Sequence, residues 1–171
     1  MDSPHAAREA AARVKAKNIP AHLEEQAVRG LIRRIAGEAY AARFTVRPLP
    51  EAHPGEDRYR LTDREDGILL EATSGTAAAS AFYWYLKNRC GSYVGPLTRR
   101  LNLPPSPPPV GGAQEETSAF LYRYFLNFCT YGYTFAFWDW EQWEPFLDWM
   151  MLSGYNLVLN PVGHEAVWLA L

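Results

Sequence analysis

The chain has 171 residues, a formal net charge of -2 at pH 7, and ordinary globular proportions of hydrophobic (48%) and charged (21%) residues. This length can bury a core in one or two domains, and so small a net charge excludes the strong field that binding to nucleic acid or an anionic membrane needs. Asp148 and Asn156 interrupt the most apolar window, so no segment reaches the roughly 20 apolar residues of a membrane span. We therefore expect no nucleic acid and no membrane as partner.

Residues 1–23 are expected to be an N-terminal extension. Ala, Arg and Lys dominate from Pro4 to Lys17, which suits a helix, and the following Asn18 to Pro20 should end it. The region has no apolar run long enough for the core of a signal peptide. Cys90 and Cys129 are too few for a disulfide framework or a zinc site, so the cysteine content leaves the compartment open.

Residues 24–103 are expected to form an α+β domain. Apolar residues at one-turn spacing predict a helix from Glu24 to Tyr40. The residues expected on its buried side are Ala27, Leu31, Ile35 and Ala39. Hydroxyl side chains at residues 73–76 can cap a second helix from Ala77 to Cys90, with Ala81 and Tyr85 on its buried side.

Three short strands are expected between these two helices. Apolar residues alternate with charged ones at Phe44–Val46 and again at Tyr59–Leu61, the pattern of strands with one buried face. The Asp66-Gly67 turn should lead into a third strand, Ile68–Ala72. Together the three strands predict a small antiparallel sheet.

A linker is expected over residues 104–117. Proline and glycine dominate residues 103–112, and such a composition forms neither a helix nor a strand ladder, so it should act as a semi-rigid spacer. We place the boundary between two domains here.

Residues 118–171 predict the beginning of a parallel α/β structure. Ala119–Cys129 is almost entirely apolar or aromatic, which is typical of a strand buried on both faces. Asp139 can cap a helix from Glu141 to Leu152, and Tyr155–Asn160 predicts a second buried strand. Strand, helix and strand in this order form a parallel βαβ unit.

The residues that follow these two strands are the candidate site, because functional groups in parallel sheets lie past the carboxyl ends of the strands. The candidates are Asn127, Cys129, Thr130, Tyr131 and Tyr133 after the first strand, and Asn160, His164, Glu165 and Trp168 after the second. Amides, hydroxyls and a carboxylate suit the paired donors and acceptors of a sugar. A zinc-protease motif at His164-Glu165 fails, because its second histidine is missing.

Each candidate also has a purely structural interpretation. Asn127 can cap a strand end or turn, Cys129 can be an inert buried side chain, and Glu165 can be a first-turn helix acid. The aromatic residues of this region can form either a dense core or a sugar-facing surface. The acidic residues Asp139, Glu141, Glu144 and Asp148 are expected on a solvated helix face rather than in a metal site.

Several short motifs occur together in one continuous stretch from Tyr122 to Trp168. They are Asn127-x-Cys-Thr, Tyr133-Thr-Phe, Trp138-Asp-Trp, Asp148-Trp-Met and Gly163-His-Glu-Ala-Val-Trp. Core packing does not generate this combination by chance, and the stretch resembles the α-N-acetylglucosaminidase family of glycoside hydrolases. The Ser74-Gly-Thr-Ala-Ala-Ala helix that ends at Cys90 resembles the N-terminal module of the same family, so the similarity runs from Glu25 to Leu171.

The resemblance implies a small α/β domain followed by a (β/α)8 barrel. It implies removal of terminal α-linked N-acetylglucosamine from glycans such as heparan sulfate, with retention of configuration, without a cofactor, and in lysosomes or outside cells. In that family two glutamates on later barrel strands break the bond. A retaining pair stands about 5–5.5 Å apart, so we expect this chain to lack its catalytic residues and to be inactive by itself.

Matched to the family residue by residue, Asn127, Cys129, Tyr133 and Glu165 are expected to bind the terminal sugar. The opening of a barrel should also leave aromatic surface exposed and favour aggregation. A rival hypothesis is a non-catalytic carbohydrate-binding or interaction module derived from the family. A third is a fragment without function. The oligomeric state stays open.

Overall fold

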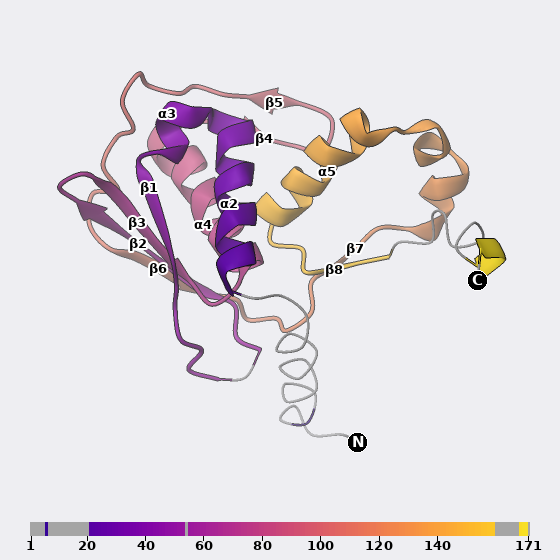
Figure 1. The fold of residues 1–171 in the computed structure, drawn as a ribbon, viewed down its shortest axis with the longest axis horizontal. Helices are drawn as coiled ribbons and strands as arrows, with labels where there is room; N and C mark the ends of the chain where they lie inside the picture. The colour runs from indigo at the N-terminus through magenta and orange to yellow at the C-terminus, as the bar shows by residue number, and fades with distance from the viewer. Residues whose placement is uncertain (1–5, 7–20, 54, 160–167, 171) are drawn as a thin grey trace.

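The computed structural model describes residues 6, 21–53, 55–159 and 168–170. Figure 1 shows a sheet, two long helices against it, and a further helix with two short strands beyond them. The elements are α2 (Ala21–Ala36), α3 (Glu38–Ala41), β1 (Phe44–Pro48), β2 (Arg58–Arg64), β3 (Gly67–Ala72), α4 (Gly75–Cys90), β4 (Tyr93–Val94), β5 (Arg99–Arg100), β6 (Gln114–Thr117), β7 (Tyr124–Phe125), the 3-10 helices η1 (Phe128–Gly132) and η2 (Thr134–Phe137), α5 (Trp140–Leu152) and β8 (Leu157–Val158). The helix expected over residues 4–17 falls outside the described residues except for Ala6.

The first sheet has four strands in the order β1-β3-β2-β6, and it is mixed rather than antiparallel. β2 and β3 form the expected antiparallel hairpin through the Asp66-Gly67 turn, but β1 pairs with β3 in parallel, with Phe44 opposite Ile68. The antiparallel expectation was therefore wrong for β1. After β1 the chain skips one strand position and enters β2, which runs in the opposite direction. It then reverses again into β3, which fits between β1 and β2 and therefore runs parallel to β1.

The Pro-rich segment packs against the domain instead of spanning open space. The Tyr40 and Tyr85 hydroxyls donate hydrogen bonds to the carbonyls of Pro104 (2.8 Å) and Pro108 (2.7 Å), and Val110 is fully buried. The last residues of the expected linker range, 114–117, form β6 and pair with β2. Residues 114–117 contain no proline, so each has the amide hydrogen that a strand ladder needs.

The main core lies between the sheet and helices α2 and α4, which pack side by side against it. β3 forms where the third strand was predicted, and its buried side chains alternate along it at Ile68, Leu70 and Ala72. The largest fully buried side chains of the main core are Tyr85, Phe44, Phe82, Ile32, Leu61, Leu70 and Leu86. Ser74 caps α4 as predicted, since its hydroxyl oxygen accepts a hydrogen bond from the Ala77 amide at 3.0 Å.

The buried face of α2 differs from the expected stripe by one position. Leu31 and Ile35 lie in the core as expected, but Ala27 is exposed, and Val28 and Ile32 occupy the centre of the buried face. The helix expected to run from Glu24 to Tyr40 is interrupted at Gly37, so Ala39 lies on α3, where it is exposed. Burying Val and Ile removes more apolar area from water than burying alanine, so packing selects the face that carries the larger side chains.

Beyond the sheet domain, β7, α5 and β8 form the expected βαβ unit. β7 and β8 are parallel, with Tyr124 opposite Leu157 and Phe125 opposite Val158. Each strand has only two residues. Tyr124 is 55% exposed, so the prediction that Ala119–Cys129 forms one strand buried on both faces was wrong, and Leu157 of the second strand, which was predicted to be buried, is 46% exposed. Burial on both faces needs neighbouring layers on each side, and in the described part of the chain this pair is covered on one face only.

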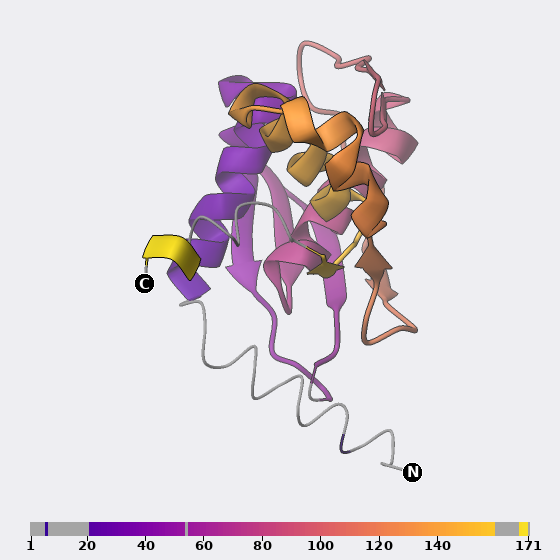
Figure 2. The same ribbon diagram turned by 90° about the vertical axis from the view of Figure 1, so that its right-hand side faces the viewer.

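Helix α5 starts and ends as predicted and joins the two parts of the molecule. The Asp139 carboxylate accepts from the Glu141 amide at 2.9 Å, and the Gln142 side chain accepts from the Asp139 amide, which completes a capping box. Leu152 belongs to the main core, whereas Phe146 and Met150 belong to a second, aromatic cluster. Figure 2 shows α5 lying beside α4. No helix in the described part of the chain is long and apolar enough to cross a bilayer.

Candidate functional site

The chain turns sharply where β7 ends, immediately before the candidate residues. Leu126 is buried with φ of 112°, and it is the one non-glycine residue with positive φ in the described part of the chain. The Tyr124 hydroxyl donates to the Leu126 carbonyl at 2.8 Å. Side chains other than glycine rarely adopt this conformation, so the surrounding contacts hold the turn that directs Asn127 and η1 away from the strand.

Asn127 combines the capping role with an unused donor. Its Oδ1 accepts from the Cys129 amide at 3.0 Å, and its carbonyl accepts from the Thr130 hydroxyl at 2.6 Å. Within the described residues its Nδ2 group has no hydrogen-bond partner, and the side chain is exposed. The structural and the ligand-binding interpretations are therefore compatible, because each uses a different atom of the amide.

Cys129 and Tyr133 are both accessible. Cys129 is a free, exposed thiol, so the interpretation of it as an inert buried side chain was wrong. Tyr133 is 74% exposed at the junction of η1 and η2. Exposed aromatic and polar groups next to Asn127 give this edge the mixed character of a sugar-binding surface.

The candidates after the second strand fall mostly outside the described residues. This applies to Asn160, His164 and Glu165. Trp168 is described and is 75% exposed. The role of Glu165 stays a prediction.

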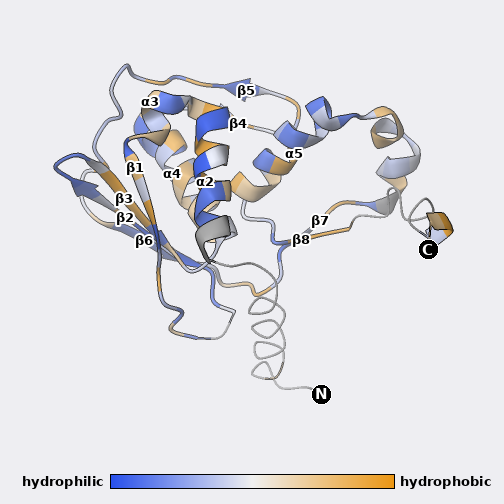
Figure 3. Ribbon diagram, viewed as in Figure 1, coloured by the Kyte–Doolittle hydropathy of each residue, from blue (hydrophilic) through white to orange (hydrophobic). Residues whose placement is uncertain are grey.

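The aromatic residues divide between core and surface. Phe125, Phe135, Trp143, Phe146 and Trp149 contact one another at ring-centroid distances of 5.0 to 6.2 Å, mostly tilted or edge to face, as aromatic cores pack. The exposed members are Phe120, Tyr122, Tyr124, Tyr133, Phe137, Trp140 and Trp168. Figure 3 shows hydrophobic colouring along β7 and β8, outside the sheet domain. The core interpretation therefore holds for the first group, whereas the second group is exposed and its sugar-facing role stays a prediction.

Tyr131 connects the two strand ends. Its hydroxyl donates to the carbonyl of Leu159, just past β8, and its ring lies against Phe135 and Trp143. Burial raises the pKa of the Tyr131 phenol above its ordinary value, so the hydroxyl stays a hydrogen-bond donor further into the alkaline range than a free phenol does. Tyr131 thus holds together the two segments that follow the carboxyl ends of β7 and β8.

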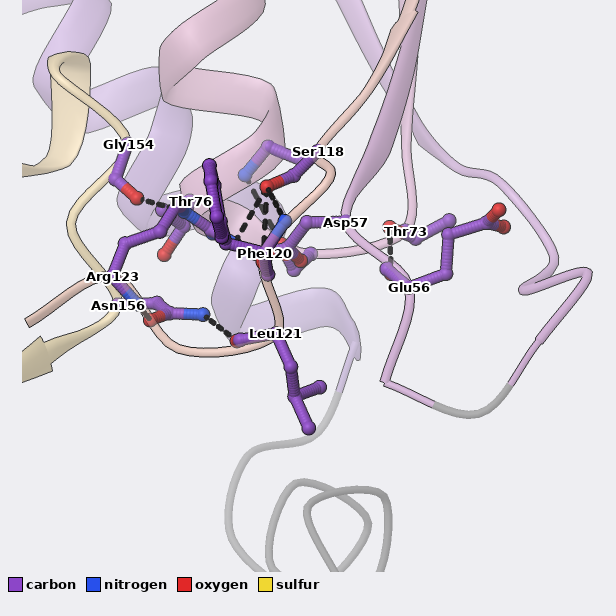
Figure 4. Close-up of polar contacts among 12 residues, drawn as sticks. Glu56, Asp57, Thr73, Thr76, Ser118, Phe120, Leu121, Arg123, Gly154 and Asn156 are labelled. Atoms are coloured by element: carbon purple, nitrogen blue, oxygen red, sulfur yellow. Dashed lines mark hydrogen bonds and ion pairs between the residues drawn. The ribbon is translucent and has the colours of Figure 1, made fainter. Parts of the chain in front are cut away.

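Three ion pairs among the described residues attach this unit to the first domain, and sequence reasoning missed all of them: Arg123–Asp57, Arg34–Asp148 and Arg34–Glu144. Arg123, immediately before β7, pairs with Asp57 in the network of Figure 4. Arg34 of α2 holds Asp148 of α5 through two hydrogen bonds of 2.8 and 2.5 Å, and these bonds raise the pKa of Arg34. Asp148 is only 5% exposed, so its expected place on a solvated helix face was wrong. A signal for Arg123 was available, since it is the one basic residue from 120 to 168.

Among the described residues, no group of three or more His, Cys, Asp or Glu side chains could hold a metal ion. The polar groups at this edge are hydroxyls, amides and a thiol, which bind neutral polar ligands.

Family models match both parts of the chain. The model described as the alpha-N-acetylglucosaminidase (NAGLU) N-terminal domain matches residues 26–109, and the model of its TIM-barrel domain matches residues 123–171. The chain belongs to the α-N-acetylglucosaminidase family. The expected fold class is confirmed: an α+β domain followed by the first βαβ unit of a (β/α)8 barrel. The exact domain boundaries stay predictions.

Known relatives agree with this assignment. The human α-N-acetylglucosaminidase is 40% identical over 149 residues, covering 85% of this chain and 20% of that protein. A family 89 glycoside hydrolase from Clostridium perfringens, in complex with PUGNAc, superposes with a TM-score of 0.80 at 32% identity over 98% of this chain and 19% of its own. A form of the Clostridium protein with two glutamates changed to glutamine, in complex with its substrate GlcNAc-alpha-1,4-galactose, gives a TM-score of 0.79 with the same identity and coverage. The chain spans about a fifth of the length of these relatives.

Proposed function

We propose that these residues form the N-terminal portion of a retaining exo-α-N-acetylglucosaminidase, which removes terminal α-linked N-acetylglucosamine from glycans such as heparan sulfate. The observation that carries this proposal is the parallel β7–α5–β8 unit following the α+β domain, in a chain that matches both domain models of one glycosidase family. The relatives' names and the ligands in the solved structures support the substrate class.

In this proposal the candidate residues bind the terminal sugar and do not cleave it. The free Nδ2 of Asn127 donates to a sugar hydroxyl, and the exposed ring of Tyr133 offers an apolar face to the pyranose. Cys129 adds a small, weakly polar contact between them. Glu165 is assigned to the same pocket from the family resemblance alone.

The bond-breaking groups are assigned to another part of the protein. Retention needs two carboxyl groups about 5–5.5 Å apart across the scissile bond. Between residues 118 and 159 the acidic residues are Asp139, Glu141, Glu144 and Asp148, which lie on α5 or at its cap, and Arg34 engages Asp148. We therefore expect no hydrolysis by these 171 residues alone.

The test is an assay on 4-nitrophenyl α-N-acetylglucosaminide, with this chain and with its full reading frame compared side by side. The full frame should release 4-nitrophenol, and proton NMR should show the α-anomer of the sugar first, as retention requires. The 171-residue chain should give no turnover. Turnover by the short chain would refute the assignment of the acids, and sugar binding without turnover by the full frame would favour the binding-module hypothesis.

A further inference from the structure

The Arg123 guanidinium, set between the first domain and the βαβ unit, donates to four acceptors. Nη1 donates to the Phe120 carbonyl (2.7 Å) and the Ser118 hydroxyl (3.1 Å), Nε donates to the Gly154 carbonyl, and Nη2 donates to the Asp57 carboxylate. Its side chain is 17% exposed and that of Asp57 is 9% exposed. Figure 4 shows the side chain of Arg123 reaching from the chain just before β7 toward Asp57. A planar guanidinium fixes directions that a lysine ammonium does not.

The backbone of Arg123 fixes the two strands relative to each other. Its amide donates to Asn156 Oδ1 at 2.8 Å, and its carbonyl accepts from the amides of Asn156 (3.1 Å) and Leu157 (3.3 Å). The Asn156 Nδ2 group donates in turn to the Leu121 carbonyl at 2.9 Å. One residue thus sets where β8 begins opposite β7, and Asn127 follows four residues later.

Gly154 makes this close approach possible. Its φ is +82°, and a Cβ atom at this position would lie 3.1 Å from the Ser80 hydroxyl and 3.8 Å from Arg123 Nε. A larger residue would meet both a conformational penalty and a crowded space. The carbonyl that Arg123 contacts is therefore held in place by the fold around α4.

Asp57 is itself anchored in the first domain. The Ser74 hydroxyl donates to its Oδ1, and the same hydroxyl caps α4. The Asp57 carbonyl accepts from the Ser118 amide at 2.8 Å. The Asp57 carboxylate therefore fixes the Arg123 side chain relative to α4 and to β2, which begins at the next residue.

We propose that Asp57 and Arg123 are positioning residues, through which the N-terminal domain sets the register of β7 against β8 and hence the place of the sugar-binding edge at Asn127. This inference rests on the proposed function for its effect on turnover. Among the described residues, the hydrogen bonds and ion pair of the two side chains do not involve Asn127, Cys129 or Tyr133, so the effect is exerted through the backbone. A displacement of about 1 Å at a substrate-positioning group can cost about a hundredfold in rate.

The chain supplies a matched control in the Arg34–Asp148 pair. It also joins the two parts of the molecule through a buried carboxylate, but it connects α2 to α5, where Arg34 also pairs with Glu144 at 3.7 Å. Among the described residues, the hydrogen bonds and ion pairs of Arg34 and Asp148 do not involve β7 or β8. A purely structural role predicts similar behaviour for both pairs. A positioning role predicts a difference between them.

The experiment compares Arg123→Lys, Asp57→Asn and Asp148→Asn in the full reading frame. We expect kcat/KM on 4-nitrophenyl α-N-acetylglucosaminide to fall by about ten- to a hundredfold for the first two, while Asp148→Asn lowers the melting temperature to a similar extent with kcat/KM within about twofold of wild type. Equal losses of kcat/KM for all three variants at equal loss of melting temperature would overturn the proposal. So would full activity in Arg123→Lys.

Hydrogen exchange gives a readout that does not need activity. In Arg123→Lys and Asp57→Asn, the amides of Asn156 and Leu157 should exchange about tenfold faster than in wild type, because local opening becomes easier. In Asp148→Asn these amides should keep their wild-type rates. Unchanged exchange in all variants would refute the positioning role, whereas an inactive wild type with the expected exchange pattern would refute only the proposed function.

Discussion

At the scale of single residues, one side chain can serve folding and binding at once. Asn127 uses its oxygen to cap η1, and its nitrogen has no partner among the described residues at the edge where a sugar is proposed to bind. The backbone just before it is held at the positive φ of Leu126. Such strain is maintained only by strong surrounding contacts, which here include the Tyr124 hydroxyl.

Asn127→Ser separates these two roles. Serine is as good a helix cap as asparagine, so the melting temperature should stay close to wild type, but the amide donor is lost. If Asn127 binds the sugar, kcat/KM of the full reading frame should fall by about tenfold, the value of one hydrogen bond of about 1.4 kcal/mol. Steady-state kinetics with 4-nitrophenyl α-N-acetylglucosaminide measures this, and an unchanged kcat/KM would leave Asn127 with its capping role only.

At the scale of elements, the Pro-rich segment depends on hydrogen bonds from two buried tyrosines. Prolines cannot donate backbone hydrogen bonds, but the carbonyls of Pro104 and Pro108 accept from Tyr40 and Tyr85. Burial raises the pKa of Tyr40 to about 12 from its ordinary value of 10. Burial also raises the pKa of Tyr85 well above its usual range.

These shifts predict a loss of stability in alkali. Below pH 10 both phenols are neutral in the folded and unfolded states, so the stabilisation is fully present. As pH rises from 10 toward 12, they ionise in the unfolded chain first, and the free energy of unfolding falls by about 1.4 kcal/mol per pH unit for each tyrosine.

Tyr85→Phe should reduce the fall in the free energy of unfolding between pH 10 and 12 by about 1.4 kcal/mol per pH unit, the contribution of one tyrosine. It should also cost about 1 kcal/mol at pH 8, because the Pro108 carbonyl loses its donor. Urea unfolding at several pH values measures both effects. Tyr122→Phe is the matched control, since Tyr122 is 55% exposed. An equal slope in Tyr85→Phe and wild type would contradict the prediction.

At the scale of the whole molecule, the two halves differ in how completely they bury their apolar residues. The sheet, α2 and α4 enclose one continuous core. Most of the exposed large hydrophobic residues lie instead between Phe120 and Leu169, around β7, η1, η2 and β8. Large exposed apolar patches mark surfaces that associate with other surfaces.

We therefore expect the 171-residue chain to self-associate. Sedimentation velocity should show species larger than the monomer, in proportions that rise with protein concentration. Phe137→Ser and Trp140→Ser, at exposed positions three residues apart in the chain, should shift the distribution toward monomer. Leu97→Ser is the control, because Leu97 is 84% exposed, close to the 88% of Phe137, but lies on the first domain. A monodisperse wild-type monomer at all concentrations would contradict this expectation.

The sequence by itself determined the local elements and the family. Periodicity located α2, α4 and α5, the caps at Ser74 and Asp139 agreed with observed hydrogen bonds, and the motifs from Tyr122 onward identified the family. These signals are local, because capping and burial periodicity depend on neighbours within a few residues along the chain.

Only the tertiary structure decided which distant residues meet. It placed β1 beside β3, buried Asp148 against Arg34, held the Pro-rich segment against the domain and joined Arg123 to Asp57. The sequence around Asp148 does not distinguish a carboxylate that faces water from one that pairs with an arginine 114 positions away. The physical reason is that ion pairs and strand neighbours depend on how elements pack together, and one-dimensional spacing does not record that packing.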